Sequence, residues 1–549
     1  MICSTNDNAI KNFQKRSERQ IHKKKKLQSM DTGGISLFLQ SYKLPKIKKN
    51  KIHKHKHDFD YNSIRCYPDL LSDFPQRIRN EEISCIPIPK QLDLSQHHGH
   101  GIPFGTFDKI PVGIAQGEEG NTVVIGGPGS GKSRYFAKSA LKNFDGAICV
   151  TDVKGELSEY YKNLYEIGVV KRPYLIFDPV RENSIGYDPF FWLSQDDPNN
   201  LVGNLWEIIY ALLPSPIYEN EPFWTQSEQA LLFAALLYYH KLDISFSDAI
   251  LLILDSNVMV LCEEILNSDT PLPKDIIRIL KFALGLMACN EIEMVASIDR
   301  GLRNKLLTFA CDAQINHAFR KKEKGSNCFS WDDLDKYNIF IRIPENRIEE
   351  WSGAVNLMYT QLIRHLERRP DKYTPEGAKN IQTLLLMDEF ARFGKLQTIT
   401  SAISTLRSKN VNICLIIQSL AQLDKVYSEY DRRIIFDCCS YQAILRVNDA
   451  DTQHYVSSLI GTRKMVTESV SEHMTPFMDT TGFSRQLSET RELTVFPHEL
   501  AILKDVLLLT PHGLFRLKKS NCTTMQPEYR LKQMARLIKL DKPSDFSNQ

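Results

Sequence analysis

The chain has 549 residues, of which 42% are hydrophobic and 25% are charged, a composition typical of globular proteins. This composition excludes wholesale disorder, collagen and coiled-coil rods, and the length suggests three or four domains of about 150 residues each. The net charge of +3 conceals an uneven distribution. Residues 1–57 hold 15 Lys and Arg against 3 Asp and Glu, a net charge of +12, which leaves −9 on the other 492 residues. A basic head on an acidic body predicts a polyanionic partner for the head.

Neither a secretory signal nor a membrane-spanning segment is evident in the sequence. The basic N-terminus is not followed by an apolar run, and the longest such run, Ala230–Tyr239, has ten residues where a spanning helix needs about 18–20. The twelve cysteines form no C-x-x-C pair, and most lie in apolar stretches, which is typical of reduced thiols. We therefore expect a soluble cytosolic protein, or one attached to a membrane surface.

The chain begins with polar, basic segments and then changes character. Residues 1–60 are rich in Lys, His, Asn and Ser and predict a disordered tail, and residues 61–100 read as a linker. From about Gly101, short apolar runs alternate with amphipathic stretches, which indicates a parallel sheet covered by helices on both faces. The expected strands are Thr122–Ile125, Ala147–Thr151, Tyr174–Phe177, Asn338–Ile343, Thr383–Met387, Asn412–Ile417, Gln442–Val447 and Val506–Leu509.

Helical periodicity replaces this alternation between about residues 190 and 330. Thr225 and Glu228 have the spacing of a capping box and predict a helix from there to His240. Further helices are expected at 246–253, 275–287 and 293–312. The pattern predicts an all-helical domain at 190–330, inserted into an α/β domain made of residues 101–190 and 330–530, with a tail at 531–549.

The strand Thr122–Ile125 runs into a glycine-rich loop and then a helical stretch from Arg134 to about Leu141. The loop matches the pattern G-x-x-x-x-G-K-[ST] with Gly126, Gly127, Pro128, Gly129, Ser130, Gly131, Lys132 and Ser133, followed by Arg134. Backbone N–H groups of such a loop surround phosphates, and the next helix points its positive end at the anion. Lys132 would contact the β- and γ-phosphates and Ser133 would bind Mg²⁺. This predicts a site for ATP and Mg²⁺.

Two acids and an amide complete the expected site. Asp388 directly follows the apolar strand Thr383–Met387 and would orient Mg²⁺, and Glu389 would act as general base on the attacking water. Gln418 ends the next strand, thirty residues after Asp388, and would contact the γ-phosphate or align the water. Lys132 and Asp388 are 256 residues apart, more than a compact core needs, which supports the helical insertion.

These segments resemble the coupling ATPases of type IV secretion and conjugation, of the TraG/TraD type, over residues 100–530. The similar segments are Asp388–Leu396 (second nucleotide motif), Ile417–Tyr427 (third motif), Asp152–Glu156 (where the family usually has Pro at the position of Val153) and Asn448-Asp449 with Ser457–Gly461. The resemblance implies a RecA-like P-loop motor with an inserted all-α domain, hexameric around a DNA channel. It also implies ATP-driven delivery of single-stranded DNA, with its relaxase, to the secretion channel proteins.

In such rings a neighbouring subunit supplies an arginine finger, for which Arg407 is the candidate and Arg392 a second one. The family also begins with transmembrane helices, and none is found in this sequence. The resemblance then implies a peripheral location at the inner face of the cell membrane. Attachment would come from a membrane-anchor partner or from residues 1–57 on anionic lipid, where each basic residue contributes about 1 kcal/mol.

Two other functions are compatible with a P-loop. An FtsK/HerA-type translocase would act on double-stranded DNA in segregation or repair. A non-catalytic recruitment adaptor would bind nucleotide only to set its shape, and the intact acid pair Asp388 and Glu389 argues against it.

Overall fold

The computed structural model of the protein describes residues 88–195, 200–214, 222–267, 273–288, 292–323, 325–396, 398–474 and 480–520. The expected basic tail at 1–60 and the C-terminal tail at 531–549 lie outside the described residues. The same holds for most of the expected linker at 61–100.

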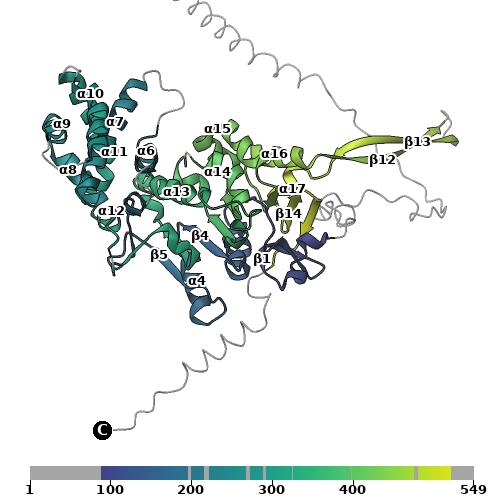
Figure 1. The fold of residues 1–549 in the computed structure, drawn as a ribbon. Coiled ribbons are helices and arrows are strands. Elements are labelled where there is room, and N and C mark those ends of the chain that lie inside the picture. The colour runs from purple at the N-terminus through teal and green to yellow at the C-terminus, as the bar shows by residue number, and fades with distance from the viewer. Residues whose placement is uncertain are drawn as a thin grey trace, which may run out of the picture. The chain divides into compact units, whose positions relative to one another are not determined.

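A nine-stranded sheet forms the centre of the fold (Figure 1). Across the sheet the order is β15 (Gly513–Leu517), β14 (Val506–Thr510), β11 (Tyr441–Ile444), β3 (Thr122–Ile125), β10 (Val411–Ile417), β9 (Thr383–Met387), β4 (Ala147–Asp152), β8 (Asn338–Arg342) and β5 (Tyr174–Phe177). The strands from β11 to β5 run parallel, and β14 and β15 add an antiparallel edge. All eight expected strands lie in this sheet, so the predicted mostly parallel α/β fold is confirmed.

The strands are mainly apolar because helices cover both faces of the sheet. Alternate residues of β10 enter separate cores: Ile413 and Leu415 face one side, and Cys414 and Ile416 face the other. Along the first side lie α13 (Ser352–Glu367), α14 (Ile399–Thr405) and α15 (Leu420–Asp437), and along the second lie α3 (Lys138–Asn143) and α4 (Glu156–Glu166). Two more helices follow, α16 (Ala450–Ile460) and α17 (Pro497–Ala501). Burial on both faces explains why no polar alternation marks these strands.

Between β6 (Gly186–Tyr187) and β7 (Cys328–Phe329), which pair in parallel, the described residues form helices and connecting turns (Figure 1). The helices are α5 (Phe191–Gln195), α6 (Leu201–Leu212), α7 (Pro222–Lys241), α8 (Phe246–Asp255), α9 (Val258–Asn267), α10 (Lys274–Ala288), α11 (Ile292–Cys311) and α12 (Ala313–Ala318). We call residues 188–327 the helical segment. It shares one hydrophobic core with the α13 side of the sheet. Within the described ranges, no helix of the chain combines the length and apolar character needed to cross a bilayer.

The predicted capping box at the start of α7 is wrong. The helix begins at Pro222, and Thr225 and Glu228 are both buried within it. The Glu228 carboxylate pairs with Lys305 of α11 and fills the space next to Gly301. The Thr-x-x-Glu pattern therefore reflects an ion pair between two helices, in which the carboxylate is buried and the lysine is partly exposed, and it does not mark a helix start. Trp331 is fully buried, whereas Phe223 and Trp224 are partly exposed.

Two hairpins were not predicted. The first, β1 (Gly101–Phe107) and β2 (Ile110–Ala115), meets the sheet through a bridge between Thr106 and Lys518. The turns before it, η1 (Lys90–Leu92) and η2 (Leu94–His97), bury Leu92 and Leu94, so this part of the expected linker is packed. The second hairpin joins β12 (Thr462–Met474) to β13 (Thr480–Leu493), in a segment rich in Ser, Thr and Glu. Such a composition lacks the apolar alternation from which strands are predicted.

Candidate active site

The glycine-rich loop connects β3 to a helical turn at the carboxyl edge of the sheet. Its backbone is held by neighbouring strands: the Gly126 N–H donates to the carbonyl of Ile417 (3.2 Å), and the Gly127 N–H donates to that of Arg446 (2.7 Å). Gly131 needs to be glycine because its φ is +98° and the ring of Tyr135 occupies the space of a Cβ. The loop is therefore shaped before any ligand arrives.

The helix after the loop starts differently from the prediction. Lys132–Ala137 form a π-helical turn, η3, and the regular helix α3 begins only at Lys138. π-helical turns are rare and frequently occur at functional sites. This turn carries Lys132, Ser133 and Arg134, three of the expected nucleotide-binding residues.

Lys132 is folded back into the loop. Its Nζ donates to the carbonyl oxygens of Gly126 (2.5 Å) and Gly127 (3.3 Å), and its side chain is buried. Burial lowers the pKa of Lys132, and the charges of Asp388 and Glu389 oppose this shift. The amine thus lies among the backbone groups that would surround phosphates.

Ser133 and Asp388 meet across the site, as a shared metal ion requires. The Ser133 hydroxyl donates to Asp388 Oδ2 at 3.5 Å. Two oxygens bound to one Mg²⁺ at 2.0–2.1 Å lie about 3–4 Å apart, so these residues fit the ion. Burial, with the neighbouring charge of Glu389, raises the pKa of Asp388 to about 6. A cation bound between these residues would favour the ionised form of this carboxyl group.

Glu389 contacts polar side chains from several neighbouring segments. It is buried, and its backbone has a left-handed conformation with φ of 52°. The amide of Gln418 donates to Glu389 Oε1 at 3.4 Å, because β10 lies between β3 and β9 and ends at the same edge. The Nε of Arg392 lies 2.8 Å from Oε2, and the Nη1 of the same guanidinium pairs with Glu345. The structure therefore brings together Lys132, Ser133, Asp388, Glu389 and Gln418.

One cation at this site had no predicted role. Lys154 Nζ lies 3.2 Å from Glu389 Oε1, and it belongs to the loop that follows β4. Because β4 pairs with β9, the residues after Asp152 and those after Met387 emerge side by side. The signal in the sequence was a polar loop at the carboxyl end of an apolar strand, and the strand order was needed to interpret it.

Arg407 lies away from the candidate active site of its own chain. It belongs to the turn η9 (Leu406–Lys409) before β10, at the opposite edge of the sheet from the glycine-rich loop. Its Nε pairs with Glu119, which precedes β3, and this hydrogen bond raises the pKa of Arg407 further. The side chain is 64% exposed, so a second subunit could reach it.

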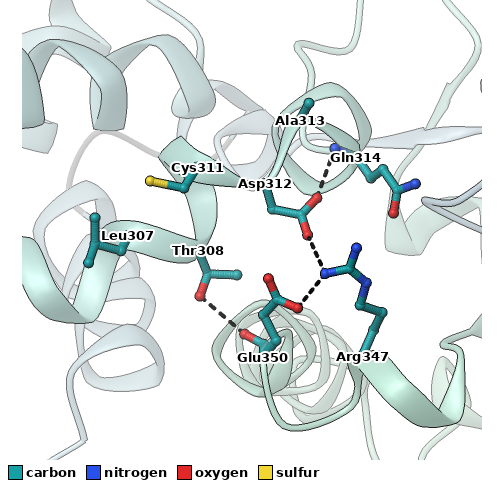
Figure 2. Close-up of a pocket in the computed structure, with 8 residues that line it drawn as sticks. All are labelled: Leu307, Thr308, Cys311, Asp312, Ala313, Gln314, Arg347 and Glu350. Carbon is teal, nitrogen blue, oxygen red and sulfur yellow. Dashed lines mark hydrogen bonds and ion pairs between the residues drawn. The ribbon is translucent and has the colours of Figure 1, made fainter.

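A separate cavity of about 490 Å³ lies where α11 and α12 meet the turn before α13 (Figure 2). Figure 2 shows Arg347 between Asp312 and Glu350, at 3.7 and 2.5 Å, while Thr308 donates to the carbonyl of Glu350 at 3.1 Å. Trp351 Nε1 also donates to Asp312, at 2.8 Å. These hydrogen bonds and ion pairs connect α11 and α12 to the turn before α13, so they link the helical segment to the part of the chain that packs on the sheet.

Curated relatives match part of the chain. Protein VirD4 of Agrobacterium fabrum (strain C58 / ATCC 33970) is 24% identical over 238 residues, which cover 42% of this chain and 34% of VirD4. Conjugal transfer protein TraG of the same strain is 27% identical over 175 residues, which cover 31% of this chain and 25% of TraG. The matched stretches thus span about a third or less of these relatives.

Solved structures share the fold over a larger part of the chain. The unbound monoclinic form of the bacterial conjugative coupling protein TrwBdeltaN70 gives a TM-score of 0.53 at 16% identity, covering 79% of this chain and 92% of that one. TrwB in complex with ADP and Mg²⁺ gives 0.51 at 16% identity, covering 78% and 92%. These similarities confirm the predicted RecA-like P-loop fold.

The family model described as Type IV secretory system Conjugative DNA transfer matches residues 96–510. This range contains the glycine-rich loop, the acid pair, Gln418 and the helical segment. Since the match covers well over half of the sequence, the chain belongs to the type IV secretory system conjugative DNA transfer family.

Proposed function

We propose that this chain is an ATP-hydrolysing coupling protein that delivers single-stranded DNA, with its attached relaxase, to a type IV secretion channel. Family membership supports the role in DNA transfer. TrwB has been solved with ADP and Mg²⁺ and with a non-hydrolysable ATP analogue, which supports the choice of nucleotide. The observation that carries the proposal is the meeting of Ser133, Asp388, Glu389 and Gln418 within 3.5 Å contacts at the ends of adjacent strands.

Each residue of the site has a separate role in the proposed hydrolysis of ATP. The loop N–H groups and Lys132 bind the β- and γ-phosphates, and Ser133 and Asp388 hold Mg²⁺, which neutralises charge on the phosphates. Glu389 accepts a proton from water while Gln418 orients it. The water oxygen then bonds to the γ-phosphorus as the bond to the β–γ bridging oxygen breaks, which leaves ADP and phosphate.

The active form is a homohexamer in which Arg407 acts on the nucleotide of a neighbouring subunit. Two observations support this role: Arg407 is exposed, and it lies at the opposite end of the strands from the glycine-rich loop of the same chain. A guanidinium supplied this way stabilises charge in the transition state. Arg392 is better suited to holding Glu389 and Glu345 together, because it pairs with both.

The basic residues 1–57 attach the protein to the inner face of the cell membrane, through anionic lipid or an anchor protein. Their support is the net charge of +12. The test is flotation of the full chain and of a chain lacking residues 1–57 with anionic vesicles, with and without DNA. Equal flotation of both forms would contradict a role of this head.

ATP turnover with and without single-stranded DNA tests the activity. We expect DNA-stimulated turnover that Lys132→Ala and Glu389→Gln abolish and that the surface variant Lys171→Met retains. No turnover in the wild type under both conditions, with Lys132→Ala indistinguishable from it, contradicts the proposal. Directional displacement of a triplex strand along duplex DNA, without a relaxase, would instead indicate a double-stranded DNA translocase.

Mixing two inactive variants tests the role of Arg407. Lys132→Ala subunits cannot hydrolyse ATP but still present Arg407, and Arg407→Ala subunits have the reverse defect. If Arg407 acts across the interface, mixed rings regain part of the activity. Glu119→Gln serves as the control, because it removes the ion pair of Arg407 and leaves the guanidinium in place. No recovery in the mixture, with Glu119→Gln as inactive as Arg407→Ala, would assign the pair a structural role.

A further inference from the structure

The loop after β4 holds the backbone of Lys154 in one position. Asp152 accepts hydrogen bonds from the Ser158 N–H (2.7 Å) and hydroxyl (2.6 Å), which ties the loop to the start of α4. Gly155 has a φ of +69°, and the guanidinium of Arg342 lies where its Cβ would be. No other residue fits at Gly155 without moving Arg342. The loop is thus fixed at both ends, and only the side chain of Lys154 is free to change its direction.

The side chain of Lys154 reaches from this loop to Glu389. Its Nζ lies 3.2 Å from Glu389 Oε1, and it is 52% exposed where Glu389 is 6% exposed. Partial burial works against the charged form, but the hydrogen bond to Glu389 and the charges of Glu389 and Asp388 raise the pKa of Lys154. Lys154 is therefore a cation at neutral pH, placed between the catalytic carboxylate and solvent.

The contact occupies the oxygen that the reaction needs. Glu389 Oε1 faces both Lys154 and the amide of Gln418, and Oε2 faces Arg392. A general base has to lie within about 2.6–3.2 Å of the proton donor, so the attacking water needs one of these oxygens. Since Gln418 orients the water, the water belongs at Oε1, which Lys154 already contacts.

The two cations on Glu389 differ in how firmly they are held. Arg392 pairs with two carboxylates, Glu389 and Glu345. Among the described residues, Lys154 has an ion-pair contact with Glu389 alone. The flexible four-carbon stem of a lysine lets its ammonium move between neighbouring anions. A γ-phosphate placed for attack by the water on Glu389 lies within reach of such a movement, and it carries more negative charge than one carboxylate.

We infer that Lys154 binds the γ-phosphate of ATP, leaves Glu389 to do so, and thereby frees Oε1 for the attacking water. This inference rests on the proposed ATPase function. ADP has no γ-phosphate, so Lys154 stays on Glu389 in the ADP-bound and nucleotide-free states. Lys154 then makes hydrolysis depend on an intact triphosphate, which keeps the general base engaged until substrate is present.

Nucleotide affinity tests the inference without requiring turnover. The full-length protein and its Lys154→Met variant are titrated with ATPγS and with ADP in the presence of Mg²⁺. Because a hydrogen bond to a charged group contributes about 1.5–3 kcal/mol, ATPγS should bind about 10- to 100-fold more weakly to the variant. ADP affinity should stay within about threefold, because ADP has no γ-phosphate for Lys154 to bind. Lys154→Arg should recover part of the loss, and Lys171→Met is the matched control.

Turnover supplies the second measurement. Lys154→Met should lower kcat by about 10²–10³, the usual effect of removing one group that stabilises transition-state charge. Equal losses of ATPγS and ADP affinity would overturn the inference, because they indicate a disturbed loop. Unchanged affinity for both nucleotides would overturn it too. If the wild type hydrolyses no ATP, the proposed function fails, and the ratio of ATPγS to ADP affinity still decides the role of Lys154.

Discussion

The buried carboxyl group of Asp388 should make the nucleotide-free protein less stable than its neutral analogue. In the folded chain the pKa of Asp388 rises from 3.8 to about 6, first through burial and then through the charge of Glu389. The folded protein therefore binds this proton more tightly than the unfolded chain does. Stability falls as the pH rises from about 4 through 6, and above pH 6 the full penalty is present.

The magnitude follows from the two pKa values. Each pKa unit corresponds to about 1.4 kcal/mol, so the ionised carboxyl group destabilises the fold by about 3 kcal/mol at pH 7 and by about 0.5 kcal/mol at pH 4. Asp388→Asn keeps the shape and removes the charge. It should raise the free energy of unfolding by about 3 kcal/mol at pH 7, and this gain should shrink steadily toward pH 4.

Thermal unfolding in EDTA, with nucleotide removed, measures this effect. A gain of about 3 kcal/mol corresponds to a rise in Tm of about 3 °C for a chain of this size. The exposed acid Asp145 provides the control, since Asp145→Asn should leave Tm unchanged. Adding Mg²⁺ and ATP should reverse the order, because only the wild type can hold the ion. A variant that is no more stable than the wild type at pH 7, or whose gain persists at pH 4, would refute the reasoning.

Three substitutions test the packing around the site and in the helical segment. Asn121→Ala removes the buried amide that bonds the Ile403 carbonyl (2.7 Å) and the Ile413 N–H (3.0 Å), and should cost about 2–4 kcal/mol in denaturant unfolding. Gly131→Ala forces a Cβ into the ring of Tyr135 at a φ of +98°, so ATPγS affinity should fall by about 5- to 150-fold by titration, since such strain costs about 1–3 kcal/mol. Lys305→Met leaves the Glu228 carboxylate buried without its cation and should cost about 3 kcal/mol, much of which Glu228→Gln in the same chain should restore.

The sheet could be predicted from the sequence because its strands are buried on both faces. Runs such as Thr383–Met387 are apolar without interruption, and each ends at a turn or a charged residue. The same property places Asp388 and Gln418 at one edge, since parallel strands share the direction of their carboxyl ends. The glycine-rich loop is a contiguous motif, so its residues needed no tertiary information.

The rest depended on contacts between distant segments. Lys154 contacts Glu389 only because β4 lies next to β9 in the sheet. The periodicity of a single strand does not predict which strand will be its neighbour. The spacing of Thr225 and Glu228 is compatible with a capping box and also with an ion pair between Glu228 and Lys305. Only the position of α11, which carries Lys305, distinguishes the two. Arg407 was expected from its place after the second motif, yet its position relative to a second subunit is a property of the assembly.

The place of β3 in the sheet also has a consequence for how the protein is made. Its two neighbours are β10 and β11, and the side chain of Asn121, just before β3, bonds the backbone of Ile413, 292 residues later. A ribosome adds about 5–20 residues per second, so the glycine-rich loop waits about 15–60 s for the strands that flank it. The helical segment is synthesised in that interval. The strands that flank the glycine-rich loop are therefore made only after the helical segment, and the candidate nucleotide site is among the last parts of the described chain to form.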